Sequence, residues 1–343
     1  MKAFAFAHGP DWRACVEALG RPGRGLGFVY FTDALVGASQ EILSTLKSET
    51  GVDDWIGTVG TGILATGAEY QDGPALAAMV ADVDAFSVFS GRTPLKSSGS
   101  FAVVHADPAA PDLPGLVSDM SAKVGTGFIV GGVSSSRSHT VQIANEVLRG
   151  GLSGAVLGEV AVATRLTQGC TPYPGRWRVT EGEDNLIARL DGRPALEVLL
   201  EAVGGERTQL LVGLTVPGSE TGAHFPDYTA RNIVGVDPKA GVVAIGDLVE
   251  PGMEILFCKR DAAAARKDLE GILASLKRDA PHPRGALYYS CVARGEHMFG
   301  GRGAELDVIK RTLGEVPLVG FFCNGEISRD RLYGYTGVLT VFR

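Results

Sequence analysis

The segment LVGFFCNGEI, residues 318–327, is an apolar run that ends in cysteine, asparagine and glycine and is followed by a carboxylate. Such a run is typical of a buried strand. A second apolar run, GALYYSC at 285–291, precedes Arg294 by a similar interval. An unpaired buried charge is costly, so each charge needs a partner or solvent. If the two strands are neighbours, we expect Arg294 and Glu326 to lie close together at the mouth of a pocket.

Two roles are open for these charges. They can form a structural ion pair, or a clamp in which Arg294 binds the anionic group and Glu326 the cationic group of a zwitterionic ligand. Polar and small residues of the same two turns join them as ligand-binding candidates: Cys291, Gly295, Asn324 and Gly325. A nearby guanidinium can activate a thiol as a nucleophile. Free cysteine at the end of an apolar strand is more often a small buried hydrophobe, so we expect Cys291 to be buried and unreactive.

Two further segments, WIGTVGTGIL (55–64) and FIVGGVSSSR (128–137), also run from an apolar strand into a glycine-containing turn. Turns of this kind can present backbone N–H groups to a ligand. Gly131, Gly132 and Ser134 are therefore added to the ligand-binding candidates.

Composition limits the class of protein. The 343 residues are 45% hydrophobic and 21% charged with a net charge of −7, as expected of a soluble globular protein that binds no nucleic acid. The sequence has neither an apolar run long enough for a membrane span nor a signal peptide, so we expect a cytoplasmic location. Five cysteines without a C-x-x-C pair and scattered histidines indicate neither a disulfide framework nor a metal site.

Strand-like runs alternate with amphipathic segments along the chain, which predicts an α+β fold with two lobes, each a mixed or mostly antiparallel sheet covered by helices. A doubly wound parallel sheet is the alternative. The Pro- and Gly-rich stretch 216–233 places the division near residue 220, giving lobes 1–220 and 221–343. Helices are expected after Asp33, after Ser138, after Pro194, after Asp261 and around Leu306–Leu313.

Three blocks in order, GALYYSCVARG, EVPLVGFFCNGEI and YGYTGVLTVF, together resemble the C-terminal half of the FIST family (F-box and intracellular signal transduction). FIVGGVSS and the stretch 155–199, which contains Gln168-Gly169-Cys170, are similar to its N-terminal half. The resemblance spans roughly residues 25–343, and it adds Cys170 to the candidate site residues.

This resemblance implies a sensory module that binds a small molecule, such as an amino acid or related metabolite. No output domain is visible in the sequence, so we expect a stand-alone module that signals through a separate partner such as a histidine kinase or cyclase. We expect no catalytic activity and no cofactor. The alternatives are a haem-binding nitric-oxide sensor, as in some relatives, and an enzyme with Cys291 or Cys170 as nucleophile.

Overall fold

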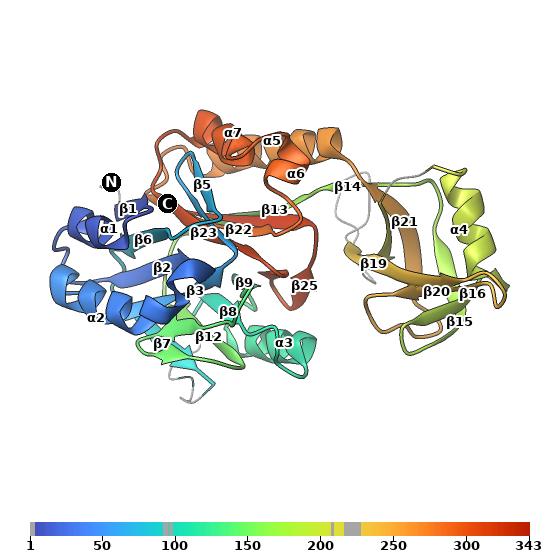
Figure 1. Ribbon diagram of the computed structural model, residues 1–343, viewed down its shortest axis with the longest axis horizontal. Helices are drawn as coiled ribbons and strands as arrows, with labels where there is room; N and C mark the ends of the chain where they lie inside the picture. Colours follow the sequence, from blue (N-terminus) through green and yellow to red (C-terminus); the bar gives the residue numbers. More distant parts are fainter. Residues whose placement is uncertain (1–3, 92–94, 96–98, 207–208, 216–227) are drawn as a thin grey trace. The chain divides into compact units, whose positions relative to one another are not determined.

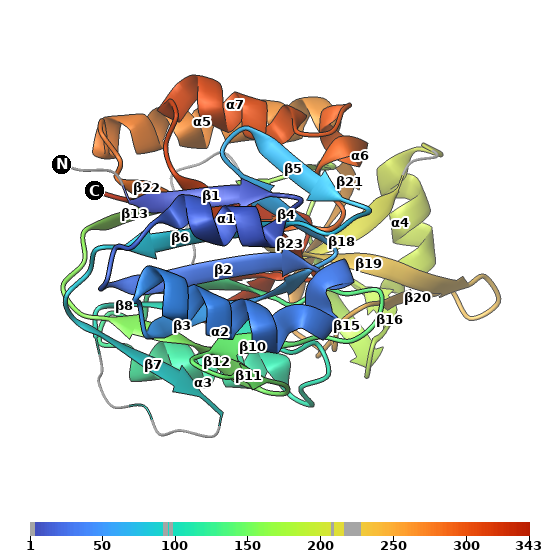
Figure 2. The ribbon, with the colours of Figure 1, turned by 60° about the vertical axis from the view of Figure 1, so that its left-hand side comes forward.

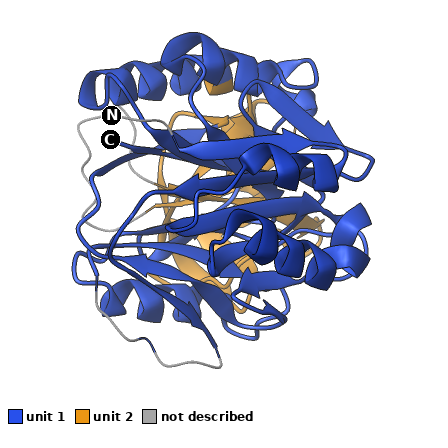
Figure 3. Ribbon diagram, turned by 90° about the vertical axis from the view of Figure 1, so that its left-hand side faces the viewer, with its two compact units in different colours: residues 1–168, 266–343 blue, residues 169–265 orange. Residues whose placement is uncertain are grey.

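The computed structural model describes residues 4–91, 95, 99–206, 209–215 and 228–343. Two compact units make up the chain, and Figure 3 colours them separately. Unit 1 comprises residues 1–168 and 266–343, and unit 2 comprises residues 169–265. The division expected near residue 220 lies outside the described residues. The unit boundaries differ from the two expected lobes because strands after residue 266 pair with strands before residue 168.

Unit 1 contains three six-stranded sheets, here called A, B and C (Figures 1 and 2). Sheet A has the order β1-β6-β2-β3-β10-β11, sheet B the order β13-β26-β22-β23-β4-β5, and sheet C the order β25-β24-β9-β8-β12-β7. Sheet A consists of β1 (Ala5–Gly9), β2 (Leu26–Thr32), β3 (Asp54–Gly60), β6 (Leu76–Ala81), β10 (Gln142–Ala144) and β11 (Val147–Leu148). Sheet B consists of β4 (Gly62–Ala65), β5 (Ala68–Gln71), β13 (Val162–Gln168), β22 (Gly285–Cys291), β23 (Leu318–Cys323) and β26 (Thr336–Phe342). Sheet C consists of β7 (Phe86–Ser90), β8 (Phe101–Ala106), β9 (Ile129–Val133), β12 (Leu152–Leu157), β24 (Glu326–Ser328) and β25 (Arg331–Tyr333).

Each of these sheets is mixed, with one parallel pair among antiparallel neighbours. The parallel pairs are β2–β3, β22–β23 and β8–β9. The expected mixed or mostly antiparallel sheets are therefore confirmed, and the doubly wound parallel alternative is wrong.

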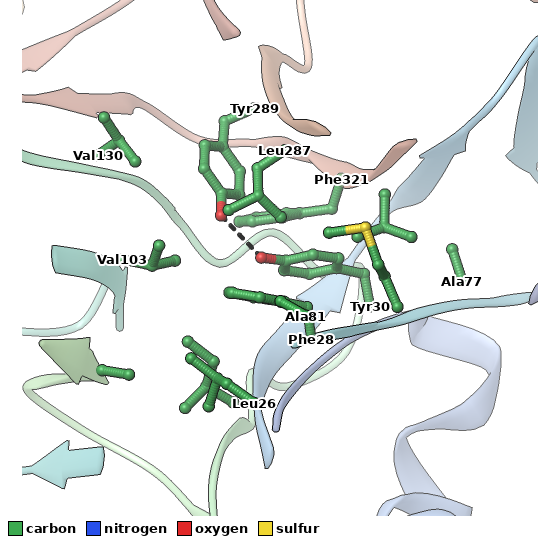
Figure 4. Close-up of a cluster of buried hydrophobic side chains, with 14 of the residues drawn as sticks. Leu26, Phe28, Tyr30, Ala77, Ala81, Val103, Val130, Leu287, Tyr289 and Phe321 are labelled. Carbon is green, nitrogen blue, oxygen red and sulfur yellow. Dashed lines mark hydrogen bonds between the residues drawn. The ribbon is translucent and has the colours of Figure 1, made fainter. Parts of the chain in front are cut away.

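The main core of unit 1 is enclosed by one face of each sheet. Tyr30 of sheet A, Tyr289 and Phe321 of sheet B and Val103 of sheet C all contribute to it (Figure 4). The hydroxyls of Tyr30 and Tyr289 are hydrogen-bonded at 2.8 Å in this core. This bond satisfies two buried hydroxyls that would be costly to leave unpaired.

Helices cover the outer faces of the three sheets. Helices α1 and α2 pack on sheet A and α3 packs on sheet C, through apolar residues of their buried stripes. Figures 1 and 2 show α5 and α7 beside sheet B. The described helices are α1 (Trp12–Leu19), η1 (Asp33–Ala38), α2 (Ser39–Thr50), α3 (Leu113–Lys123), α4 (Ala195–Val203), α5 (Ala262–Asp279), α6 (Glu296–Phe299) and α7 (Ala304–Leu313). Of these, α4 belongs to unit 2.

The helix expected after Ser138 is not formed, and β10 and β11 take its place. Asn145 makes the turn between them with a φ of 63°, and β10 pairs with β3. Val141 and Ile143 join the core between sheet A and its helices, so pairing with an existing sheet overrides the helical spacing.

Unit 2 is an antiparallel sheet whose pairing closes on itself. The ring runs β21-β15-β16-β20-β19-β18 and returns from β18 to β21. Helix α4 and the inner residues of this ring share one hydrophobic core. The strands are β14 (Cys170–Pro172), β15 (Trp177–Glu183), β16 (Leu186–Leu190), β17 (Arg193–Pro194), β18 (Leu210–Thr215), β19 (Tyr228–Asp237), β20 (Val242–Ile245) and β21 (Glu254–Arg260).

Candidate functional site

The carboxyl ends of β22 and β23 lie side by side, which is the condition on which the expected meeting of Arg294 and Glu326 depended. Cys291 and Cys323 are register partners at the last residue of each strand. The three glycine-containing turns also meet here: the backbone N–H of Thr61 donates to Ser135 Oγ at 2.9 Å, and that of Asn324 donates to the Val133 carbonyl at 3.0 Å. Ligands of α/β proteins commonly bind at the carboxyl ends of parallel strands.

Arg294 is enclosed at this end, with a relative exposure of 1%. Its Nη2 lies 2.6 Å and its Nε 2.9 Å from Oε1 of Glu305. Tyr288 and Ser290 also donate hydrogen bonds to Glu305, at 2.6 and 3.1 Å. Burial acts to lower the pKa of Arg294, but attraction to Glu305 raises it overall, so the guanidinium keeps its charge.

Glu305 was missed by the sequence reasoning. It lies in the first turn of α7, one residue before Leu306 of the apolar stripe. Its place beside this apolar stripe is the feature of the sequence that indicates a buried carboxylate. Nη1 of Arg294 has no hydrogen-bond partner among the described residues.

Glu326 is fully buried at the start of β24. It accepts hydrogen bonds from the backbone N–H and hydroxyl of Thr336, at 3.1 and 2.6 Å, and from the Cys323 thiol at 3.2 Å. Burial raises the pKa of Glu326 to about 7, against the opposing effects of these hydrogen bonds and of Arg294.

Arg294 and Glu326 therefore belong to one buried cluster and interact electrostatically. Two details of the expectation are wrong. Both side chains are enclosed rather than placed at a pocket mouth, and the ion-pair partner of Arg294 is Glu305. The physical reason is that α7 covers the outer face of sheet B and brings a carboxylate nearer than Glu326.

Cys291 is buried, as expected, and burial raises the pKa of its thiol to about 12. Cys323 is also buried and its pKa is raised, first by burial and then by the charge of Glu326. Both thiols are therefore protonated at neutral pH. Slow alkylation of Cys291 stays a prediction.

The glycine and small-residue candidates have tight structural contacts. A Cβ on Gly131 would lie 1.7 Å from the Val104 carbonyl oxygen, and one on Gly132 would lie 2.8 Å from Cys323 Cβ. Gly295, with a φ of 62°, allows a turn that packs on Phe322. These glycines let strands and turns approach closely.

The remaining candidates have different surroundings. The Ser134 hydroxyl is buried and hydrogen-bonded to Thr58 at 2.6 Å, whereas Asn324 is exposed. The Gly325 carbonyl accepts a hydrogen bond from Val133 at 2.9 Å. Cys170 belongs to unit 2, whereas the other candidates belong to unit 1.

An open pocket of about 460 Å³ lies at the other end of β22, within unit 1. Its volume is in the range of small-molecule sites. No pattern in the sequence indicates this pocket, because its walls come from five separate segments of chain. The lining residues are Phe4, Asp82, Val83, Asp84, Ala85, Glu159, Val160, Ala161, Arg284, Phe342 and Arg343.

The pocket combines aromatic rings with both signs of charge. The rings of Phe4 and Phe342 meet edge to face with centroids 5.4 Å apart. The Arg284 guanidinium lies 4.6 Å from the Phe4 centroid and 3.6 Å from an Asp82 carboxylate oxygen. Such a surface can hold an apolar group together with an anionic and a cationic one.

Family models match most of the chain. The FIST N domain matches residues 25–193 and the FIST C domain matches residues 195–329. The chain belongs to the FIST family. FIST domains are sensor domains of signal transduction.

Mycobacterial proteins are among the relatives of this FIST chain. "Uncharacterized protein Rv0628c" of Mycobacterium tuberculosis (strain ATCC 25618 / H37Rv) is 30% identical over 332 residues, covering 88% of this chain and 87% of the relative. "Uncharacterized protein Mb0898c" of Mycobacterium bovis (strain ATCC BAA-935 / AF2122/97) is 29% identical over 372 residues, covering 97% and 96%. Across the described part of the chain, no helix has the length and apolar character needed to cross a membrane.

Proposed function

We propose that this FIST protein is a sensory domain that binds an amino acid or a related small metabolite in the pocket beside Arg284. It passes the signal to a separate partner, such as a histidine kinase or a cyclase. The pocket itself carries the proposal, because it is open, large enough for a metabolite and lined by charges of both signs.

The lining suits a zwitterion in particular. Arg284 is partly buried, with a side-chain exposure of 22%, and its guanidinium can bind a carboxylate. Carboxylates at Asp82, Asp84 and Glu159 offer partners for an ammonium group. The rings of Phe4 and Phe342 provide an apolar surface for the remaining side chain of the ligand.

A thermal-shift screen with amino acids and related metabolites tests this proposal. A saturating ligand at about a hundredfold excess over Kd stabilises the folded protein by about 2.7 kcal/mol. We expect Arg284→Met and Asp84→Asn to weaken the shift.

Arg24→Met is the matched control, since Arg24 also lies near Asp82, at 3.5 Å, but does not line the pocket. It should leave the shift unchanged. Ligands whose shift is insensitive to both pocket variants would exclude this site.

The clamp of Arg294 and Glu326 is a second candidate site. The unpartnered Nη1 of Arg294 favours it, because that nitrogen can still donate to a ligand carboxylate. Binding there requires the enclosing turns to open at exposed Asn324. Asn324→Asp should then weaken binding of an anionic ligand and Asn324→Lys should not. Equal affinities for the two variants would count against the clamp.

Two alternatives are tested by the purified protein itself. A Soret band would favour the haem sensor over the expected protein without a cofactor. Alkylation of Cys291 or Cys170 by iodoacetamide faster than that of a model thiol would favour an enzyme with a cysteine nucleophile.

A further inference from the structure

Two cysteines of unit 2 lie on paired strands, near the points where the chain enters and leaves this unit. In the ladder between β14 and β21, Cys170 pairs with Arg260 and Pro172 pairs with Cys258. Cys258 is thus two residues from the position opposite Cys170, on the same face of the ladder. Hydrogen bonding to Cys170 is also the largest cause of the raised pKa of Cys258.

The pair is asymmetric in exposure and in surroundings. Cys170 has a relative exposure of 9%, whereas Cys258 has 0%. Arg260 is the register partner of Cys170, so the two side chains project from the same face of the ladder. The hydrogen bond from Cys170, together with burial, holds the pKa of Cys258 above its ordinary value. Oxidation should therefore begin at Cys170.

Closing a bond between these sulfurs needs only a small local movement. Diagonal partners in an antiparallel ladder have Cα atoms about 7–8 Å apart, and a disulfide needs at most about 6.8 Å. Strand β14 has three residues and, among the described strands, pairs only with β21, so it can move toward its partner.

We propose that Cys170 and Cys258 are a reversible redox site that hydrogen peroxide or another small hydroperoxide converts to a disulfide. The Cys170 thiolate attacks the peroxide, the O–O bond breaks, and Cys170 becomes a sulfenic acid while water or an alcohol leaves. The Cys258 sulfur, giving up its proton, then displaces the hydroxyl from Cys170, which departs as water. The two thiols lose two electrons in total, and the peroxide gains them. A low-molecular-weight thiol restores the pair by exchange.

The test treats the full chain with hydrogen peroxide and then alkylates and maps its peptides without reduction. We expect a peptide joined through Cys170 and Cys258, which disappears after dithiothreitol. In Cys258→Ser, dimedone should trap a sulfenic acid on Cys170. In Cys170→Ser, Cys258 should stay a free thiol at the same dose.

Cys291 and Cys323 serve as the internal control, because they are also neighbours but both are enclosed in unit 1 with protonated thiols. Their alkylation after denaturation should be unchanged. The proposal is overturned if wild-type Cys170 and Cys258 are both still alkylated after peroxide, or if Cys291 and Cys323 join first. Peptide mapping of the wild type decides this even if a variant fails to fold.

Discussion

Arg294 and Glu305 form a fully enclosed ion pair, which makes each the other's main charge partner. Removing one member of such a pair leaves the other buried and uncompensated. We expect Glu305→Ala to lower the free energy of unfolding by about 3–5 kcal/mol in urea titrations. Glu315→Ala removes an exposed carboxylate, 2.8 Å from Lys310, and should change it by less than about 1 kcal/mol. Equal changes in the free energy of unfolding for the two substitutions would show that the buried ion pair stabilises the protein no more than the exposed one.

Glu326 should make stability depend on pH. Its pKa rises from an ordinary 4.5 to about 7 in the folded state, chiefly through burial. Between these values the folded state binds more protons than the unfolded state, so stability falls as pH rises from about 4.5 through about 7, by up to about 3 kcal/mol.

Glu326→Gln cannot titrate and should lose this contribution. Urea unfolding of wild type and variant across this pH range measures it, and the advantage of wild type over variant should shrink as pH rises. A constant difference between the two proteins would show that Glu326 has an unshifted pKa.

At the scale of elements, β9 depends on a glycine where it passes β8. An added Cβ on Gly131 would lie 1.7 Å from backbone oxygen of Val104, which no side-chain rotation relieves. We expect Gly131→Ala to destabilise the protein by about 1–3 kcal/mol, measured by thermal and urea unfolding.

Gly271 provides the contrast, because it lies in the middle of α5 and an added Cβ would meet nothing within 4 Å beyond its chain neighbours and the backbone of its own helix. Gly271→Ala should raise stability by about 0.5–1 kcal/mol, since alanine loses less backbone entropy in a helix. If Gly131→Ala left the stability unchanged, β9 would pack less closely on β8 than the 1.7 Å approach to Val104 implies.

At the scale of the whole molecule, unit 2 is a continuous segment inserted between two parts of unit 1. The ends that it connects are neighbours in unit 1, where the backbone N–H of Gln168 donates to Asp268 Oδ2 at 2.8 Å. Replacing residues 169–265 by a short Gly/Ser linker should therefore leave unit 1 folded, with a cooperative urea transition.

The excised unit 2 should fold as well, because its sheet closes on itself around a core of its own. Circular dichroism and amide-proton dispersion of the two fragments measure both expectations. Loss of cooperative unfolding in either fragment would show that the units depend on each other for stability.

The sequence by itself determined the strands at 285–291 and 318–323 and the helices α4, α5 and α7. The spacing of their apolar residues and the residues that begin and end them lie within each segment, so the local sequence is enough to predict the conformation of each. Its ordered motifs were also sufficient for the FIST family. The buried state of Cys291 followed in the same way, from the apolar run that precedes it.

Only the tertiary structure decided which distant segments meet. The ion-pair partner of Arg294 is Glu305. The segment after Ser138 forms a hairpin that pairs with β3. Residues 266–343 belong to the same compact unit as the first 168 residues. The tertiary structure also formed the pocket beside Arg284 from five separate segments. Charge partners, strand partners and cavities depend on contacts between residues far apart in the chain. The local spacing of apolar and polar residues does not predict those contacts.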